Sequence, residues 1–223
     1  MKKWAIFTPF LFAKKPDRLN IDRFIESYCH IRHNVITLNG ITLVQSDEDN
    51  FPDFIKAVYK KLDLDYAKFF KMDNLSKLGF IAAEVLFNKG LTIHGDEKIA
   101  IALSNRASSL DTDRKYQTSI NDADNYYPSP GVFVYTLPNI CIGEISIRHK
   151  LQTENSFFIF DAFNAGYLKD FSDNLLDTQK ADKVLCGWVD MDRDRYEAFL
   201  YLVSPTGGQF HTEEEIIRLY TTK

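Results

Sequence analysis

Several features are scarce in this chain of 223 residues, and each scarcity argues against a class of protein. The 3 cysteines, Cys29, Cys141 and Cys186, are far apart and odd in number, which argues against a disulfide framework and for a reducing cytoplasm. Lys and Arg number 27 against 31 Asp and Glu, so no basic excess attracts nucleic acid. No run reaches the roughly 18 apolar residues of a membrane-spanning helix.

The N-terminus has the charged and apolar parts of a signal peptide but lacks its cleavage site. Lys2 and Lys3 precede an apolar run, but Lys14-Lys15-Pro16 follows where small residues and a cleavage site are required. We therefore expect residues 3–9 to form a buried strand. Linkers, repeats and low-complexity tracts are missing as well, so the sequence predicts a single domain over 1–223.

Aromatic residues are the most conspicuous component that is present. They make up 14% of the chain, and 18 residues are Phe, which suggests a core or groove lined by rings. Hydrophobic residues at 45% and charged residues at 26% are ordinary values for a globular protein. No phosphate-binding loop, dinucleotide fingerprint or Gly-x-Ser-x-Gly segment occurs, and no cofactor is expected.

Periodicity and capping residues predict alternating helices and strands. Asp73 and Asp111 are expected helix N-caps, and Thr212 with Glu215 forms a capping box. The predicted helices cover residues 20–33, 52–62, 73–90, 111–120, 131–136, 138–149, 164–177 and 212–220. The predicted strands cover residues 3–9, 98–103, 156–160, 182–189 and 197–203. This alternation favours an α/β fold with a mostly parallel sheet covered on both faces, while residues 33–51 stay unassigned.

Residues 157–166 read Phe-Phe-Ile-Phe-Asp-Ala-Phe-Asn-Ala-Gly, a strand, a turn and the start of a helix. Several α/β enzymes present a nucleophile at such a turn. With the sequence before it, the segment resembles the active-site elbow of a β-ketoacyl synthase, in which a Cys takes the acyl chain. Here Phe163 stands at the matching position, flanked by Asp161, Ala162 and Asn164. A phenyl ring cannot form a thioester, so the resemblance implies an acyl-transfer fold without acylation chemistry.

Three further blocks resemble the same family, in the same order. They are Lys71-Met72-Asp73 with the following Ala-rich helix and Gly90-Leu91, the strand at 99–104, and the stretch 130–150 containing Leu137-Pro138-Asn139. After the elbow, residues 183–190 resemble the family's next strand. The resemblance covers about residues 70–205.

The resemblance implies half of a thiolase-like fold. That half is a five-stranded mixed sheet of order 3-2-1-4-5, with the last strand antiparallel and helices on both faces. Ketosynthases are about twice as long, and their catalytic histidines lie in the other half, so neither His149 nor His211 matches them. Chain length factors are the nearest precedent for a ketosynthase-like subunit without the Cys, since they also lack this residue and act as partners of an active subunit.

Other reactive side chains have simpler explanations. Cys141 and Cys186 lie in apolar segments, where a buried, inert thiol is expected. Cys29, His30 and His33 are too few ligands for a typical zinc site, so no metal is expected. Residues 190–195 are expected to connect two strands as a solvated hairpin.

Three charged residues have both a structural and a functional interpretation, and the sequence does not decide between them. Arg148 and Lys150 either complement the negative end of a helix or form a docking patch for an acyl carrier protein. Asp161 is either a turn former or, if it is desolvated, a general acid or base.

The combined hypothesis is a catalytically degenerate ketosynthase-like subunit of fatty-acid or polyketide-type biosynthesis, inactive alone. It would pair with itself or with a ketosynthase through residues 155–160, with Phe157, Phe158 and Phe160 near the interface. Two alternatives remain: half of a split acyltransferase completed by a partner, and a binding module for acyl carrier protein or an acyl chain. The expected compartment is the cytoplasm.

Overall fold

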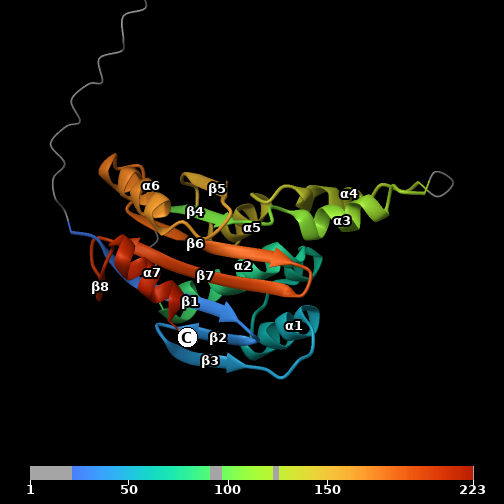
Figure 1. The fold of residues 1–223 in the computed structure, drawn as a ribbon, viewed down its shortest axis with the longest axis horizontal. Helices are drawn as coiled ribbons and strands as arrows, with labels where there is room; N and C mark the ends of the chain where they lie inside the picture. Colours follow the sequence, from blue (N-terminus) through green and yellow to red (C-terminus); the bar gives the residue numbers. More distant parts are fainter. Residues whose placement is uncertain (1–21, 91–96, 123–125, 223) are drawn as a thin grey trace, which may run out of the picture.

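One mixed β-sheet organises the protein (Figure 1). The computed structural model describes residues 22–90, 97–122 and 126–222. Within these residues the sheet has eight strands in the order β3-β2-β1-β7-β6-β4-β5, and β8 pairs with β1. The strands are β1 (Phe24–Arg32), β2 (Val35–Leu38), β3 (Ile41–Gln45), β4 (Ile99–Asn105), β5 (Asn155–Ile159), β6 (Lys183–Asp192), β7 (Arg195–Ser204) and β8 (Gln209–Phe210).

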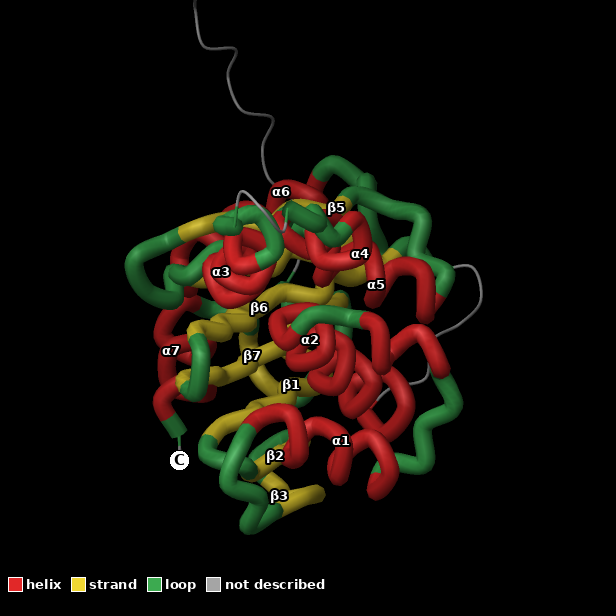
Figure 2. The backbone as a smooth tube through the Cα atoms, turned by 90° about the vertical axis from the view of Figure 1, so that its right-hand side faces the viewer, coloured by secondary structure: helices red, strands yellow, loops and turns green. Residues whose placement is uncertain are grey.

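Helices cover both faces of this sheet, as the sequence predicts (Figure 2). The α-helices are α1 (Phe51–Lys61), α2 (Asn74–Val85), α3 (Leu110–Thr118), α4 (Pro130–Phe133), α5 (Ile140–His149), α6 (Ala165–Asp177) and α7 (Glu213–Thr221). Shorter helical segments are η1 (Ala67–Lys71), η2 (Leu86–Gly90) and η3 (Val134–Thr136). No single helix in the described residues is long and apolar enough to cross a membrane, and only the sharply bent pair Pro130–Thr136 and Ile140–His149 meets that test jointly.

Strand alternation divides the core into two layers. In β7, Ala198, Leu200 and Leu202 face α1, α2 and α5, where they join the larger cluster. Phe199 and Tyr201 point to the opposite face and pack with Leu168 of α6 and the residues of α7. The fold therefore buries both faces of its central strands, which explains why β4, β6 and β7 are almost continuously apolar.

Local capping fixes several helix starts where the sequence predicts them. The side chain of Asp73 accepts a hydrogen bond from the Ser76 amide at 2.8 Å, and Thr212 accepts one from the Glu215 amide at 3.2 Å. Asn50 caps α1, with Pro52 in the first turn. The predicted strands from β4 onward and the helices α1, α2 and α5–α7 are thus confirmed within a few residues.

The sheet is larger than predicted and its order differs from 3-2-1-4-5. β4 pairs directly with β6 along residues 99–104, so no strand lies between them. β7 follows β6 as an antiparallel neighbour, and β1 lies beyond β7. The predicted strand at residues 3–9 lies outside the described residues.

Two local predictions are wrong. Residues 20–33 were expected to be helical, but Phe24–Arg32 is a strand because both of its backbone edges are paired, with β2 and with β7. Asp111 was expected to cap a helix, but α3 begins after Ser109 and Asp111 lies in its first turn. The unassigned residues 33–51 supply β2 and β3.

Candidate functional site

The turn between β5 and α6 lies where three parallel strands end. β4, β5 and β6 run parallel, and their carboxyl ends meet at one edge of the sheet. In open α/β sheets this edge is the usual place for ligands. Here it holds a cavity of about 280 Å³. Its lining residues are Arg106, Asp161, Ala162, Phe163, Trp188, Asp190, Arg195, Tyr196, Glu197 and Tyr220.

Phe163, the residue that the sequence analysis aligns with a ketosynthase nucleophile, is held in an aromatic cluster. Its ring centroid lies 4.4 Å from that of Tyr220, 5.6 Å from that of Phe199 and 6.3 Å from that of Trp188. The ring is partly buried against the α6–α7 layer of the core. The next residue, Asn164, caps α6 by accepting a hydrogen bond from the Tyr167 amide at 2.9 Å. Packing and capping therefore fix the turn around Phe163.

Charged side chains at this cavity are already paired. The Asp190 carboxylate accepts hydrogen bonds from the amides of Arg106 and Ala107 at 3.1 and 3.0 Å. Glu197 forms an ion pair with Arg32 at 3.1 Å and accepts the Tyr220 hydroxyl. Burial and this bond to Glu197 raise the pKa of Tyr220 above its ordinary value. Asp161, the open candidate for a general acid or base, is exposed in this structure.

Among the described residues, the lining of this cavity contains no thiol that could carry an acyl group as a thioester. Its lining contains no Cys, Ser, Thr, Lys or His. Cys141 and Cys186 are buried in α5 and β6, as predicted. Burial raises the pKa of the Cys141 thiol well above its ordinary range and that of Cys186 to about 12. A neutral, enclosed thiol is a poor nucleophile.

The cluster of Cys29, His30 and His33 does not gather as a metal site. Cys29 and His30 are neighbours on β1, so their side chains point to opposite faces of the sheet. Cys29 packs in the larger core cluster, whereas the His30 ring meets Phe199 on the other side. No group of three or more metal-ligating side chains occurs within the described parts of the chain.

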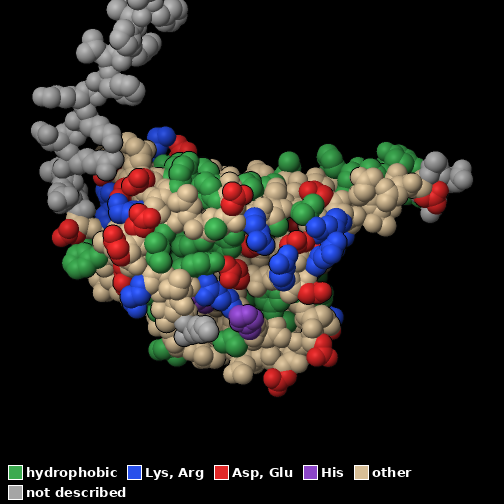
Figure 3. Space-filling model, viewed as in Figure 1, with side chains coloured by type: hydrophobic (Ala, Val, Ile, Leu, Met, Phe, Trp, Pro, Cys, Tyr) green, Lys and Arg blue, Asp and Glu red, His purple; other side chains and the backbone are tan. Residues whose placement is uncertain are grey.

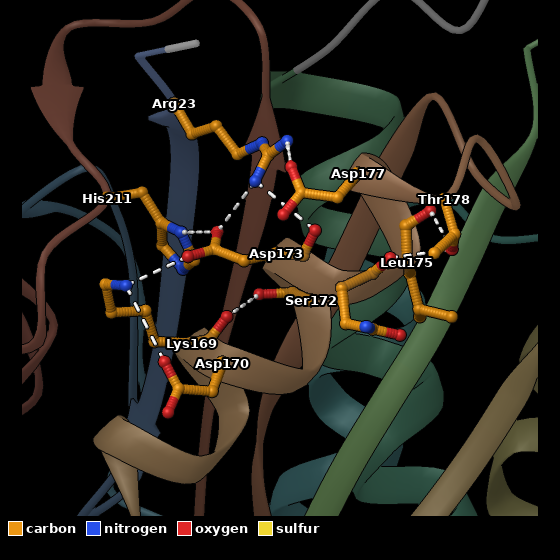
Figure 4. A network of polar contacts seen from close by, with 10 residues as sticks. Arg23, Lys169, Asp170, Ser172, Asp173, Leu175, Asp177, Thr178 and His211 are labelled. Carbon is orange, nitrogen blue, oxygen red and sulfur yellow. Dashed lines mark hydrogen bonds and ion pairs between the residues drawn. The ribbon is translucent and has the colours of Figure 1, made fainter. Parts of the chain in front are cut away.

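His149 and His211 lie in separate buried networks. Nε2 of His149 is 3.0 Å from the Glu84 carboxylate, which also accepts Nε of Arg148 at 2.9 Å. Nδ1 of His211 is 3.2 Å from Asp173, whose carboxylate also accepts the Lys169 ammonium at 2.9 Å (Figure 4). Each histidine thus lies against a carboxylate from another element, and neither lines the cavity at Phe163.

The two residues of the possible docking patch differ in their surroundings. The Arg148 guanidinium bonds to Glu84 and lies 5.1 Å from the centre of the Tyr66 ring. Lys150 follows α5 in a left-handed conformation with a φ of 57°, and its side chain is exposed. Arg148 therefore belongs to an ion-pair network, while Lys150 is accessible.

The phenylalanines of β5 face both sides of an edge strand. Phe157 packs against the larger core cluster, while Phe158 contacts Tyr167 and Phe171 of α6 at 4.9 and 5.0 Å between ring centroids. Phe160 follows the strand and contacts Tyr167 at 5.1 Å. Among the described strands β5 pairs only with β4, so its other edge has no strand partner within the described residues.

Sequence reasoning missed the residues that other elements bring to the site. Arg106 follows β4, and Tyr220 lies on the last helix. Only the right order of strands places these residues beside Phe163.

Comparison with known proteins gives likeness in structure alone. No family model and no curated protein matches the sequence. The ishigamide ketosynthase/chain length factor is similar with a TM-score of 0.58 at 17% identity, over 82% of this chain and 62% of that chain. A chain from the complex of the ketosynthase ApeO with its chain length factor ApeC from Xenorhabdus doucetiae is similar with a TM-score of 0.57 at 16% identity. The match covers 90% of this chain and 91% of that chain.

A β-ketoacyl synthase from Burkholderia phymatum is similar over 90% of this chain and 61% of its own length, with a TM-score of 0.56 at 11% identity. This chain thus spans about three fifths of two of these structures but nearly all of the matched Xenorhabdus chain. These likenesses establish the fold: a mixed sheet with helices on both faces, of the thiolase-like kind that ketosynthases and chain length factors share.

Proposed function

We propose that this protein is a ketosynthase-like subunit without acylation chemistry of its own, which acts as the partner of a ketosynthase in fatty-acid or polyketide-type biosynthesis. The observation that carries this proposal is Phe163. It occupies the turn that follows β5, and three neighbouring rings hold it there. A thioester needs a thiol at this point, and the cavity around the turn has none within the described residues.

The free edge of β5 supports an assembly role. An edge strand with unpaired backbone groups invites another strand to pair with it. β5 carries Phe157 and Phe158, and the side chain of Ile159 is 49% exposed. Pairing of β5 with the equivalent strand of a partner would cover these apolar side chains and satisfy the backbone edge.

A projecting arm, formed by α3, α4, η3 and the described residues next to them, adds apolar surface. Figure 1 shows this arm extending away from the sheet, and Figure 3 shows apolar side chains gathered on it. The large exposed apolar side chains of this arm are Leu110, Tyr126, Tyr127, Phe133, Val134 and Leu137. Exposed apolar patches of this kind mark interaction surfaces.

The structural neighbours support a partner of ketosynthase type. Two of them are described as ketosynthases together with chain length factors. The Xenorhabdus match covers 90% of this chain and 91% of that one, so a chain of nearly this length occurs in such a complex. An assembled half-length subunit is therefore physically reasonable.

Isolation of the tagged protein from its source cell, without denaturation, tests the proposal. Co-isolation of a full-length ketosynthase in a fixed ratio is the expected result. A half-length partner that carries the nucleophile or histidines would instead support a split acyltransferase. Acyl carrier protein alone would support a binding module, for which exposed Lys150 is the accessible cation of the proposed patch.

A further inference from the structure

A second cavity, of about 440 Å³, lies between the β1–β2 hairpin and the end of α7. Figure 3 shows histidine and Lys or Arg side chains next to one another in this region of the surface. The lining residues are Tyr28, His30, Arg32, His33, Val35, Thr37, Gly40, Leu219, Thr221 and Thr222. Its volume lies within the range of small-molecule pockets. None of its residues lines the cavity at Phe163.

His30 gives this cavity a polar group that the protein leaves unused. The residue is only 6% exposed, and its Nε2 atom is buried without a hydrogen-bond partner among the described residues. The ring is fixed by an edge contact to Phe199, with centroids 4.6 Å apart. A buried polar atom without a protein partner destabilises a fold, so such an atom at a cavity is available to a molecule that enters the cavity.

The surroundings of His30 favour an uncharged ligand. Burial, together with the Arg32 charge, lowers the pKa of His30 to about 4, so the ring is neutral at pH 7. The Arg32 charge is itself matched by Glu197 at 3.1 Å, and its guanidinium lies over the Tyr220 ring at 4.5 Å. α7 ends at Thr221, and the carboxyl end of a helix carries partial negative charge. An anion would therefore find little net attraction here.

The walls of the cavity are mainly apolar. Tyr28, Val35 and Leu219 contribute rings and aliphatic side chains, while Thr37 and Thr221 contribute hydroxyl groups. On one side of the hairpin, the Tyr28 hydroxyl lies so near Gly40 that a Cβ there would approach it to 3.2 Å. Gly40 has a φ of +81°, so the turn and the close approach both require glycine.

From this geometry we propose that the cavity binds a small, uncharged, mostly apolar molecule through one oxygen that hydrogen-bonds to Nε2 of His30. A hydroxyl or carbonyl oxygen serves equally, because a neutral imidazole nitrogen either donates or accepts according to its tautomer. The apolar body of the ligand packs against Tyr28, Val35 and Leu219. This inference does not rest on the proposed partnership with a ketosynthase.

Phe199 and Tyr220 connect this cavity to the turn at Phe163. Phe199 contacts both the His30 ring and the Phe163 ring, and Tyr220 contacts Phe163 and lies under Arg32. A molecule bound at His30 is therefore one layer of aromatic rings away from the turn. Substitutions on β1 and β2 can alter binding at His30 without changing a residue that lines the cavity at Phe163.

Hexan-1-ol and hexanoate form a matched pair of probes, since they share a chain length and differ in the charge of the head group. Methyl NMR of Val35 and Leu219 reports binding to the purified full chain. We expect saturable shifts with hexan-1-ol and weaker binding of hexanoate. Absence of saturation with hexan-1-ol overturns the proposal, and tighter binding of hexanoate overturns the preference for an uncharged ligand.

His30→Phe separates binding from folding. The phenyl ring keeps the contact with Phe199 and removes the unpartnered nitrogen, so the thermal midpoint should stay equal or rise. Hexan-1-ol should bind about three- to tenfold more weakly, the value of one hydrogen bond. Unchanged affinity for hexan-1-ol in this variant contradicts the role of His30.

A second pair of variants tests the place of binding. Val35→Trp fills the cavity and should abolish the shifts at Leu219. Ile41→Trp adds the same side chain to the adjacent strand at a position that is 69% exposed and outside the cavity, so binding should persist. Equal binding by both variants would mean that the probe binds elsewhere.

Discussion

At the scale of single residues, the packed ring of Phe163 carries the proposal that this turn has no acylation chemistry. Phe163 has no group that a base can activate. Its contacts with Phe199 and Tyr220 make it part of the core layer beneath α6 and α7. The turn keeps its capping residue, Asn164, so its local geometry does not depend on a catalytic side chain.

Phe163→Cys tests whether a thiol at this turn is enough to give condensation activity. We expect no carbon–carbon bond formation from acyl carrier protein substrates, because the described cavity supplies no His or Lys to support the new thiol. Product analysis by mass spectrometry is the measurement, and the unchanged protein is the control. Condensation by the variant alone would show that this chain retains the remaining machinery.

The titration of His30 makes the stability of the fold depend on pH, and a single variant isolates this effect. Its pKa is lowered to about 4 from an ordinary value of 6.5, so the unfolded chain takes up a proton first as the pH falls. The contribution of neutral His30 to stability is therefore complete above pH 6.5 and declines towards pH 4. Tyr28 contacts the ring and the Arg32 charge acts on it, while Arg32 in turn pairs with Glu197 and lies over the Tyr220 ring.

Urea unfolding at pH 6.5 and pH 4.5 measures this effect. The wild-type protein should lose roughly 2 kcal/mol more stability over this interval than His30→Phe, since each pH unit between the two pKa values is worth about 1.4 kcal/mol. An equal loss in both proteins would place the titration elsewhere.

At the scale of elements, the helices α2 and α6 and the edge strand β5 account for most of the packing around the site. α6 packs Leu168 and Leu175 against the sheet, and both are buried, as the apolar stripe of residues 168, 171 and 175 in the sequence predicts. Phe171, on the same stripe, is only partly buried and contacts Phe158 of the edge strand. The apolar stripe of α2, namely Leu75, Leu78, Ala82 and Val85, is fully enclosed.

Leu168→Ala should lower the free energy of unfolding by about 2–5 kcal/mol, because it leaves a cavity under α6. Leu168 is 0% exposed. Asn174→Ala, on the exposed side of the same helix, should change stability by less than about 0.5 kcal/mol. Denaturant titrations of both variants decide whether α6 is docked as described.

The two exposed edges of the sheet offer a matched test of assembly. Ile159→Lys places a charge on β5, and pairing of two such strands would bring like charges together. We expect dimerisation to weaken at least about tenfold in sedimentation experiments, equivalent to about 1.4 kcal/mol.

Ile41→Lys places the same charge on β3, at the opposite edge, where Ile41 is 69% exposed. This control should leave association unchanged. A wild-type protein that sediments as a monomer at tens of micromolar, with no partner added, would count against self-pairing and leave pairing with a ketosynthase as the remaining mode.

The elements that sequence patterns predict well are those whose signals are local. Asp73 and Thr212 cap their helices through their own side chains, so the starts of α2 and α7 follow from the sequence. Phe24–Arg32 is different, because its spacing also fits a helix. Only pairing with β2 and β7, which lie on both sides of it, decides for a strand. Tertiary pairing overrides local preference there.

Only the part of the site that lies within one local stretch of sequence could be predicted. The turn at Phe163 lies within one strand–turn–helix unit, whereas Arg106, Glu197 and Tyr220 reach it from three other elements. The cavity at His30 depends on β1 being a strand, so the incorrect helix at 20–33 concealed it. Strand order, which sets all these neighbours, depends on long-range pairing that no local pattern records.

At the scale of the whole molecule, the proposal joins three features of the described residues: a thiolase-like sheet, a packed aromatic turn and an apolar edge strand. The chain spans 62% of the ishigamide ketosynthase/chain length factor chain but 91% of the matched Xenorhabdus chain. The proposal combines these facts: this subunit supplies structure and a partner supplies the thiol.

The measurement that tests this claim most directly is intact-protein mass spectrometry of the isolated complex after incubation with acyl-loaded carrier protein. The account predicts an acyl adduct on the ketosynthase partner and none on this chain, whose three thiols are all buried. A stable acyl adduct on Cys141 or Cys186 would contradict it, because it would place the active site in what the structure describes as core.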